Sequence, residues 1–234
     1  MSRETYDRLW KETWGDLQRL GPVHRHQREA LLRTVRSLDV RTVLDVGCGS
    51  GENLSAFATL PALELTGVDV SAEALALAAK RVPNARLVEL DVQRRSLPEH
   101  FDLVTSIQVI EHLADDVAAL THMREMARHW VLVTSMCGTM RPSEEHIGHL
   151  RNYSFAELRE KASVAGLEVV DLFGWGFPFY SPLYRTLIEL VPGGPPTGPM
   201  GGGSQLVARM LHGLYKLNVP RRGDVVTMLA RPRR

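Results

Sequence analysis

Residues 43–51 read VLDVGCGSG, an apolar run with one acid, Asp45, that leads into Gly47, Gly49 and Gly51. A glycine-rich turn after a first strand lets the main chain approach a cofactor closely, because no Cβ atom stands in the way. In open α/β sheets ligands bind beyond the carboxyl ends of the strands, where such a turn lies. The stretch therefore predicts a small-molecule site on an open α/β sheet.

The apolar pattern on either side of this turn alternates between strand and helix periods. Strands are expected at residues 41–46, 63–70, 85–90, 101–107, 129–135 and 167–173, and helices at 52–60, 71–82, 115–128 and 154–166. Ser154 and Glu157 form a capping box, and Gly166 ends the helix that follows them. This rhythm predicts a doubly wound, mostly parallel α/β sheet, and a seventh strand at 224–232 is expected to run antiparallel at or near its edge.

Two segments lie outside this rhythm. Residues 1–37 are predicted to form an N-terminal helical cap, and residues 38–234 the main domain, with an insertion at about 174–223. The cap carries Tyr6, Trp10 and Trp14 at helical spacing, so these aromatic side chains either pack on the core or line a substrate pocket. In the insertion, an aromatic stretch precedes the Gly- and Pro-rich residues 193–204, which we expect to act as a lid.

The composition narrows the class of ligand. The chain has 234 residues with 28 basic and 27 acidic side chains, a net charge of +1, which favours small-molecule chemistry over DNA binding. Two cysteines and an N-terminus without an apolar core predict no disulfide framework and no signal peptide, hence a cytoplasmic protein. The apolar stretch around residues 177–191 is interrupted by Pro182, Arg185 and Glu189, so no transmembrane segment is expected.

The spacing of the glycines argues against a dinucleotide. A G-x-G-x-x-G fingerprint would place its third glycine at position 52, which is Glu52 in this chain. Asp45 would also repel a pyrophosphate, whereas it would attract a cation. The ligand of this turn is therefore predicted to carry an ammonium group.

Two further acids follow the next two predicted strands. Asp69 lies 24 residues after Asp45, where a carboxylate accepts hydrogen bonds from both ribose hydroxyls of a nucleoside. Asp91 is placed to accept from an adenine amino group, while Val70 and Val92 pack on the ring faces. Each acid alone could equally cap a helix or a turn. Together with the glycine turn they favour a nucleoside cofactor.

These stretches together resemble the class I S-adenosylmethionine-dependent methyltransferases, in particular the branch that acts on small molecules. The resemblance spans about residues 41–172 and rests on VLDVGCGSG (43–51), GVDVS (67–71), LDVQ (90–93) and FDLVTSIQVIEHL (101–113). It implies a seven-stranded Rossmann-like sheet with the last strand inserted antiparallel, S-adenosylmethionine as cofactor and S-adenosylhomocysteine as product. The positions implied to bind the cofactor are Asp45, Gly47, Cys48, Gly49, Gly51, Asp69, Val70, Asp91, Val92 and Gln108.

The acceptor side is predicted from loops that follow the fourth and fifth strands. His149 is the first candidate for a catalytic base and His112 the second, although either could instead be a hydrogen-bonded packing residue. Because alignment of the two reactants dominates methyl transfer, a missing base would not exclude the reaction. Candidate substrate contacts are Tyr6, Trp10, Trp14, Glu111, His146, Arg151, Tyr153, Trp175, Phe177 and Tyr180.

A metal site is a sharper hypothesis for the same loops. Similar methyltransferases of quinone biosynthesis and of small-RNA 3′-end modification hold a divalent ion with Glu-x-x-Glu-His, but here residues 108–112 read QVIEH. Gln108 replaces one anionic ligand, which weakens binding of a hard cation such as magnesium, so no metal is expected. If one binds, Glu111, His112 and either His146 or His149 are the predicted ligands.

The sequence thus predicts a methyltransferase that acts on an oxygen or nitrogen of a small molecule. Its basic tail and apolar helices also allow contact with a membrane surface and leave a lipid-linked or glycan acceptor open. Three further functions stay open: methylation of RNA, binding of S-adenosylmethionine without turnover, and a nicotinamide-dependent oxidation or reduction. The acceptor, the accepting atom and the oligomeric state are not predicted.

Overall fold

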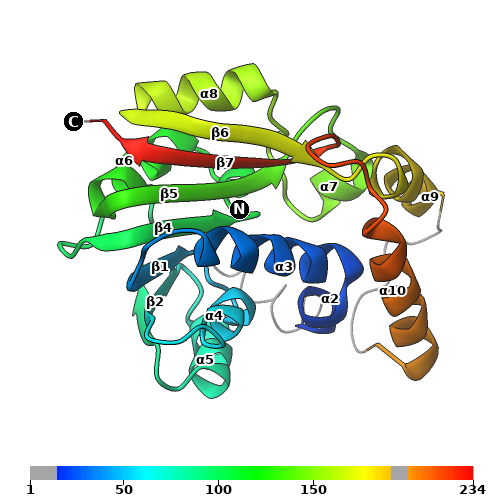
Figure 1. The fold of residues 1–234 in the computed structure, drawn as a ribbon, viewed down its shortest axis with the longest axis horizontal. Helices are drawn as coiled ribbons and strands as arrows, with labels where there is room; N and C mark the ends of the chain where they lie inside the picture. Colours follow the sequence, from blue (N-terminus) through cyan, green and yellow to red (C-terminus); the bar gives the residue numbers. More distant parts are fainter. Residues whose placement is uncertain (1–14, 191–199, 234) are drawn as a thin grey trace.

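The molecule is built on a single mixed sheet (Figure 1), and the computed structural model describes residues 15–190 and 200–233. Its seven strands have the order β3-β2-β1-β4-β5-β7-β6. They are β1 (Thr42–Val46), β2 (Glu64–Asp69), β3 (Arg86–Glu89), β4 (Phe101–Ile107), β5 (Ala127–Met136), β6 (Leu167–Trp175) and β7 (Val225–Pro232). All pairs are parallel except those of β7, which runs antiparallel to both β5 and β6. The predicted fold class is confirmed.

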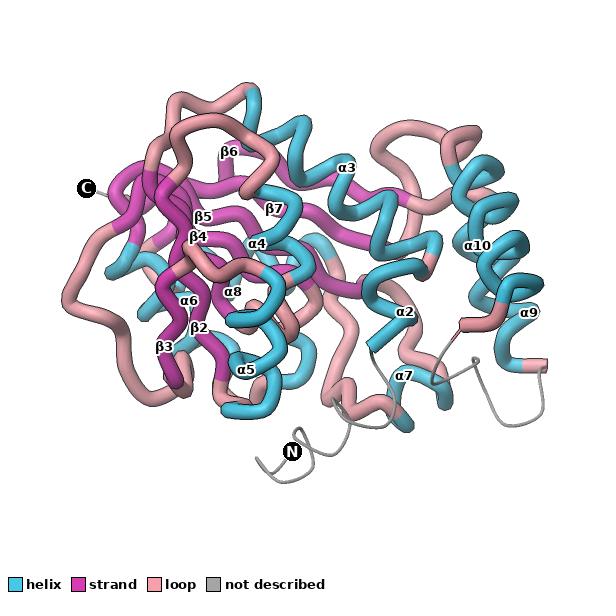
Figure 2. Tube along the Cα trace, turned by 90° about the horizontal axis from the view of Figure 1, so that it is seen from below, coloured by secondary structure: helices cyan, strands magenta, loops and turns pink. Residues whose placement is uncertain are grey.

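Helices cover both faces of the sheet. They are α2 (Gly15–Leu20), α3 (Pro22–Arg36), α4 (Glu52–Phe57), α5 (Ala72–Arg81), α6 (Asp116–Met126), α7 (Pro142–His146), α8 (Phe155–Val164), α9 (Arg185–Glu189) and α10 (Gly202–Tyr215), with a 3-10 turn η1 (Ile110–His112) and a π-type turn η2 (Phe179–Tyr184). Helices α3, α4 and α5 lie on one face and α6 and α8 on the other (Figure 2). Among the described residues, no helix combines the length and apolar composition that crossing a bilayer requires.

Two cores fill the space between these layers. Neighbouring residues of β1 point to opposite faces, so Val43 joins the core under α3 and α4 while Leu44 joins the core under α6 and α8. Both are fully buried. This burial on both sides explains why the central strands are almost continuously apolar in sequence.

The direction of β7 follows from the path of the insertion. The chain leaves β6 at Trp175 and enters β7 at Val225, and these two residues are paired across the strands. Since η2, α9 and α10 all lie between these paired residues, the chain re-enters the sheet at the same end of the strands at which it left. Strand β7 therefore runs against its neighbours and lies one position from the edge, next to β6.

Local differences from the sequence expectations have simple causes. The helix predicted at 115–128 ends at Met126, because Ala127 already pairs with Phe101 in the sheet. The capping box of Ser154 and Glu157 is confirmed. The short helices α7 and α9 and both turns η1 and η2 were not predicted, since elements of three to six residues carry too little periodicity.

The predicted cap and lid are only partly described. Helices are found at 15–20 and 22–36, and Leu31 and Val35 of α3 belong to the same core as β1 and β4. Tyr6, Trp10 and Trp14, and residues 193–199 of the predicted lid, lie outside the described residues. The division into cap and main domain, and the lid, stay predictions.

Candidate active site

The glycine turn between β1 and α4 adopts a backbone that other residues rarely take. The φ angles of Gly47, Gly49 and Gly51 are +69°, +53° and +79°. The amide groups of Gly47 and Cys48 both donate to the carbonyl oxygen of Val68, at 2.8 and 3.0 Å, which folds the turn onto β2. Cys48 is itself buried in the core, so its side chain supports the turn from below.

Asp45 lies beneath this turn with one oxygen free. It is 1% exposed, and its Oδ1 accepts a hydrogen bond from Thr105 Oγ1 at 2.8 Å. Its Oδ2 is buried and has no hydrogen-bond partner among the described residues. Burial raises the pKa of Asp45 to about 7, and the nearby Asp69 adds to this rise, whereas the side chains of Thr105 and Asn53 oppose it. A cation that reaches Oδ2 would therefore stabilise the charged form.

Asp69, at the end of β2, ties the turn to the next helix. Its Oδ2 accepts from the amide of Gly49 and its Oδ1 from the amide of Ser71, both at 2.9 Å. Each carboxylate oxygen has two lone pairs, so a carboxylate can accept from several donors at once. Asp69 thus orders the turn, and its contact with ribose hydroxyls stays a prediction.

Asp91 borders a cavity of about 340 Å³ beyond β2 and β3. The cavity is lined by Val70, Glu89, Leu90, Asp91, Arg94 and Arg95. Asp91 Oδ1 accepts from the amide of Gln93 at 3.0 Å, and Oδ2 pairs with Arg94 Nε at 3.2 Å. Val92, predicted to pack on the same ring as Val70, is instead buried in the core and does not line the cavity.

Polar groups also gather where β4 ends. Gln108 has a φ of +57° and its Nε2 is buried without a partner among the described residues. Glu111 is fully buried; its Oε2 accepts from Ser135 Oγ at 2.8 Å, and its Oε1 is unpartnered there. Burial raises the pKa of Glu111 to about 7.

The two predicted bases meet beside Glu111. The rings of His112 and His149 are 4.6 Å apart and nearly perpendicular, and His112 Nδ1 lies 3.0 Å from the carbonyl oxygen of Gly148. Burial lowers the pKa of both imidazoles to about 4. Both are therefore neutral at pH 7 and able to accept a hydrogen bond, but they are weaker bases than the reaction would ideally use.

The sequence predicts Glu111 and His112 with either His146 or His149 as metal ligands, and the structure brings the set with His149 together. Potential ligand atoms of Glu111, His112 and His149 all lie within 4.8 Å of one another, whereas His146 is not part of this group. Two of these residues offer a buried atom without a partner among the described residues, Glu111 Oε1 and His149 Nδ1. One carboxylate and two imidazoles fit a nitrogen-preferring divalent ion better than magnesium.

Two predicted substrate contacts are engaged elsewhere. Tyr153 is 1% exposed and its hydroxyl donates to Asp116 Oδ2 at 2.7 Å. Arg151 pairs with the same carboxylate at 2.7 Å. These bonds hold the loop after α7 against α6. Contact of either residue with an acceptor, like that of the exposed His146, stays a prediction.

An aromatic cluster lies beyond the carboxyl ends of β5 and β6, at the same edge of the sheet as the glycine turn. We call this edge the ligand edge. Trp175 stacks on His26 and on Tyr180, with ring centres 4.1 and 5.5 Å apart, and Tyr215 meets Trp175 edge-on at 5.8 Å. The hydroxyl of Tyr215 and Nδ1 of His26 are buried without partners among the described residues. Phe177 lies apart from this cluster, under the guanidinium of Arg222.

Sequence reasoning missed several of these residues. His26 and Tyr215 come from α3 and α10, which are far apart in sequence but contact each other. Thr105 and Ser135 are single hydroxyls within strands, a pattern with no local signature. Only the glycine turn and the acids at strand ends carry one.

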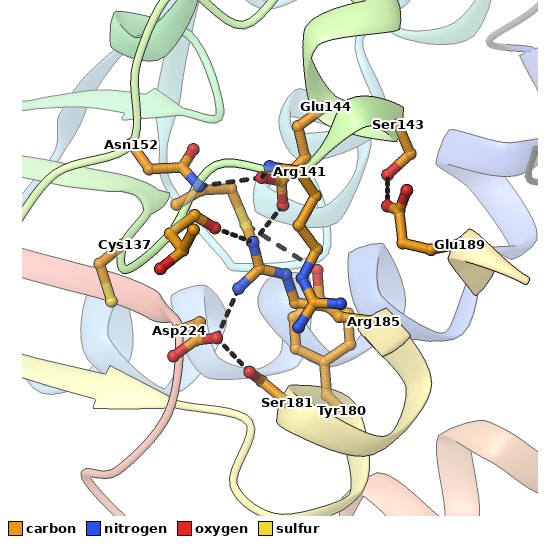
Figure 3. Close-up of polar contacts among 12 residues, drawn as sticks. Cys137, Arg141, Ser143, Glu144, Asn152, Tyr180, Ser181, Arg185, Glu189 and Asp224 are labelled. Carbon is orange, nitrogen blue, oxygen red and sulfur yellow. Dashed lines mark hydrogen bonds and ion pairs between the residues drawn. The ribbon is translucent and has the colours of Figure 1, made fainter. Parts of the chain in front are cut away.

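Arg185 connects the insertion to the loop that carries His149 (Figure 3). This buried side chain pairs with Glu144 Oε1 of α7 and with Asp224 Oδ2 before β7, both at 2.5 Å. The other oxygen of Glu144 accepts from Asn152 Nδ2 at 2.9 Å, and its carbonyl accepts from the amide of His149 at 3.0 Å. The position of α9 is thereby linked to the acceptor side of the site.

Comparisons with known proteins agree with this geometry. A family model described as a methyltransferase domain matches residues 43–130, which include the glycine turn and all three acids. A ubiquinone biosynthesis O-methyltransferase of Nitrosospira multiformis is 30% identical over 126 residues, 50% of this chain and 48% of that protein. A trans-aconitate 2-methyltransferase of Enterobacter sp. is 36% identical over 95 residues, 40% of this chain and 37% of that protein.

The chain spans about half the length of the curated relatives it matches. Among solved structures, a TehB-like SAM-dependent methyltransferase from Corynebacterium glutamicum has a TM-score of 0.56 at 19% identity, covering 88% of both chains. This likeness concerns the fold. The family model ends before the loop of His149 and before the insertion, so its match does not include these two segments.

Proposed function

Because the chain belongs to the class I S-adenosylmethionine-dependent methyltransferase family, we propose that it transfers a methyl group from S-adenosylmethionine to an oxygen or nitrogen of a small-molecule acceptor. The observation that carries this proposal is the row of Asp45, Asp69 and Asp91 at successive strand ends, around a glycine turn and a cavity. The relatives named for ubiquinone biosynthesis and trans-aconitate support a small acceptor.

Each acid has a separate part in holding the cofactor. When bound, S-adenosylmethionine supplies an electrophilic methyl group on a sulfonium. Asp45 offers its free Oδ2 to the ammonium end, and Asp69 accepts from the ribose hydroxyls. Asp91 and Val70 face the cavity that suits the adenine ring. The glycine turn lets the main chain lie against the ligand.

The acceptor side works mainly by alignment. Holding an acceptor in line with the methyl group can contribute roughly 7 to 11 kcal/mol, and a well-matched base about 100- to 10,000-fold in rate. With pKa values of about 4, His112 and His149 orient an acceptor hydroxyl more readily than they deprotonate it. A metal held by Glu111, His112 and His149 would instead lower the pKa of that hydroxyl.

The test combines binding with turnover. Calorimetry should show one site for S-adenosylhomocysteine, and labelled S-adenosylmethionine should transfer methyl to members of a panel of phenols, carboxylates and amines. We expect transfer to be unchanged in chelator, because Gln108 stands where a first carboxylate would be. Binding without transfer would favour a non-catalytic protein, transfer to RNA transcripts alone would favour RNA, and no binding would overturn the proposal.

The proposal also includes the cell compartment and the class of partner. Cys48 and Cys137 are free, buried thiols, which supports a reducing compartment such as the cytoplasm. Small acceptors rather than DNA fit the balanced charge of the chain.

Asp69→Ala tests the ribose assignment. We expect cofactor binding to weaken by about 1–3 kcal/mol, since ribose hydroxyls lose an acceptor and the amide of Gly49 loses its partner. Asp171→Ala is the matched control, because this carboxylate lies on edge strand β6 and pairs with the exposed Arg221. Calorimetry measures both dissociation constants, and an unchanged value for Asp69→Ala would show that the ribose binds elsewhere.

Asp45 predicts a pH dependence of cofactor binding. Its pKa of about 7, raised by burial, means that the folded protein holds this proton more firmly than the unfolded chain does. The protonated Asp45 carboxyl thus contributes stability to the folded state below about pH 4, and this contribution is lost as the pH rises to about 7. An ammonium group prefers the ionised form, so affinity should rise about eightfold from pH 6 to pH 7.5.

Calorimetry at the two pH values checks this expectation. Asp45→Asn, which does not titrate, should bind more weakly at both and show no such rise. A flat profile in the parent protein would mean that the ammonium does not contact Asp45.

A further inference from the structure

Helix α10 turns apolar side chains to the outside of the molecule. Its inner face buries Ala208, His212 and Tyr215 against the body of the protein. At about 100° per residue, Leu206 and Met210, each two residues from Ala208, point roughly 160° away from it. They are 59% and 68% exposed, and Leu217, in the turn that follows, is 68% exposed. The helix is therefore apolar on two opposite sides.

A second apolar stripe lies at the same end of the molecule. Leu183, Leu187 and Leu190 follow helical spacing along η2 and α9 and are 47%, 52% and 74% exposed. Both views place α9 and α10 together at this end (Figures 1 and 2). Single exposed apolar residues are normal, but two neighbouring stripes indicate a binding surface.

The charged residues of α10 and of the sequence that flanks it are all of one sign, and the acid that contacts this helix, Glu29 of α3, pairs with His212 on its inner face. The sequence from Leu190 to Gly223 has no acidic residue and four cations. Of these, Arg221 pairs with Asp171 and Arg222 stacks on Phe177. Arg209 and Lys216 are exposed, lie on one flank of the outer apolar face, and form no ion pair within the described part of the chain.

We propose that the outer face of α10 docks on the headgroup region of an anionic phospholipid membrane. This face consists of the apolar residues Leu206, Val207, Met210 and Leu217 and the cations Arg209 and Lys216. Aliphatic side chains flanked by cations on a helix are what an interfacial helix needs: the apolar groups enter the lipid boundary and the cations meet lipid phosphates.

A second copy of this chain fits the same face less well. Two-fold pairing would bring Arg209 and Lys216 of one copy onto the same patch of the other, which places like charges together at an apolar contact. An anionic bilayer supplies the opposite charge along the whole face.

Docking would place the lipid close to the acceptor side. The inner face of α10 presents Tyr215 to Trp175 and Tyr180 of the aromatic cluster at the ligand edge. Membrane binding itself does not depend on methyl transfer, so each can fail without the other.

Vesicle sedimentation tests the proposal with the full chain. We expect it to bind vesicles of phosphatidylglycerol and phosphatidylcholine, more weakly at high salt, and not vesicles of phosphatidylcholine alone. The double variant Arg209→Gln/Lys216→Gln should lower the partition coefficient about 30-fold, since each basic residue near such a surface contributes about fivefold. Leu206→Glu/Met210→Glu should abolish binding.

Val164→Glu provides the matched control. Val164 is 70% exposed on α8, well away from α10 (Figure 1), so this variant should bind like the parent chain. All these substitutions are at exposed positions, and melting curves should confirm an unchanged fold. The proposal is overturned if the parent chain ignores anionic vesicles, if the α10 variants bind as well as it does, or if size measurements show a dimer that Leu206→Glu/Met210→Glu separates without affecting vesicle binding.

Discussion

Gly47→Ala should abolish measurable binding of S-adenosylhomocysteine. The φ of Gly47 is +69°, and an added Cβ would lie 2.9 Å from Val109 Cγ1 and closer still to Cγ2. A side chain in left-handed backbone costs about 1–2 kcal/mol, and overpacking costs about 1–3 kcal/mol more. Val109 is branched at Cβ and has no side-chain torsion beyond χ1 that could move its methyl groups aside. The turn must therefore shift.

Gly213→Ala is the control for Gly47→Ala. Gly213 lies within α10, where an added Cβ would have no neighbour within 4 Å, so the same change should stabilise the helix by about 0.5–1 kcal/mol. Calorimetry and thermal melting of both variants separate lost binding from lost folding. Undiminished binding by Gly47→Ala would show that the ligand does not rest on this turn.

Much of the fold could be predicted because its signals are local. Gly47, Gly49 and Gly51 reveal a turn of unusual backbone, and Ser154 with Glu157 marks the start of a helix within four residues. Both depend only on the chain close to them. The antiparallel last strand was expected at or near the edge from the absence of a simple crossover before it, and the family resemblance implied that it is inserted antiparallel; its place between β5 and β6 is known from the structure.

The candidate site could be predicted only where the same kind of signal exists. The acids at strand ends were found from their positions, but the pKa of Asp45, which burial raises to about 7, depends on tertiary packing that no local pattern records. His26 and Tyr215 meet Trp175 only because α3 packs on α10. The same holds for Arg185, whose two carboxylate partners are more than 35 residues away.

Arg185→Met should cause the largest loss of stability. The Arg185 side chain is 4% exposed and that of its partner Glu144 10%, so removing the cation leaves a buried carboxylate without compensation. Breaking a buried ion pair in this way costs about 3–5 kcal/mol, which corresponds to a fall in melting temperature of roughly 6–20 °C for a chain of this size. Arg221→Met is the matched control: its pair with Asp171 is largely exposed, so little change is expected.

A second substitution separates the lost charge pair from lost packing. If the unpaired carboxylate causes the loss, Arg185→Met/Glu144→Gln should be more stable than Arg185→Met alone, since the glutamine amide is neutral and can still bond to Asn152. No recovery would assign the loss to packing of the Arg185 side chain. Because the carbonyl of Glu144 also accepts from the amide of His149, a shift of the His149 ring resonances in Arg185→Met, and not in Arg221→Met, would show that the insertion positions this histidine.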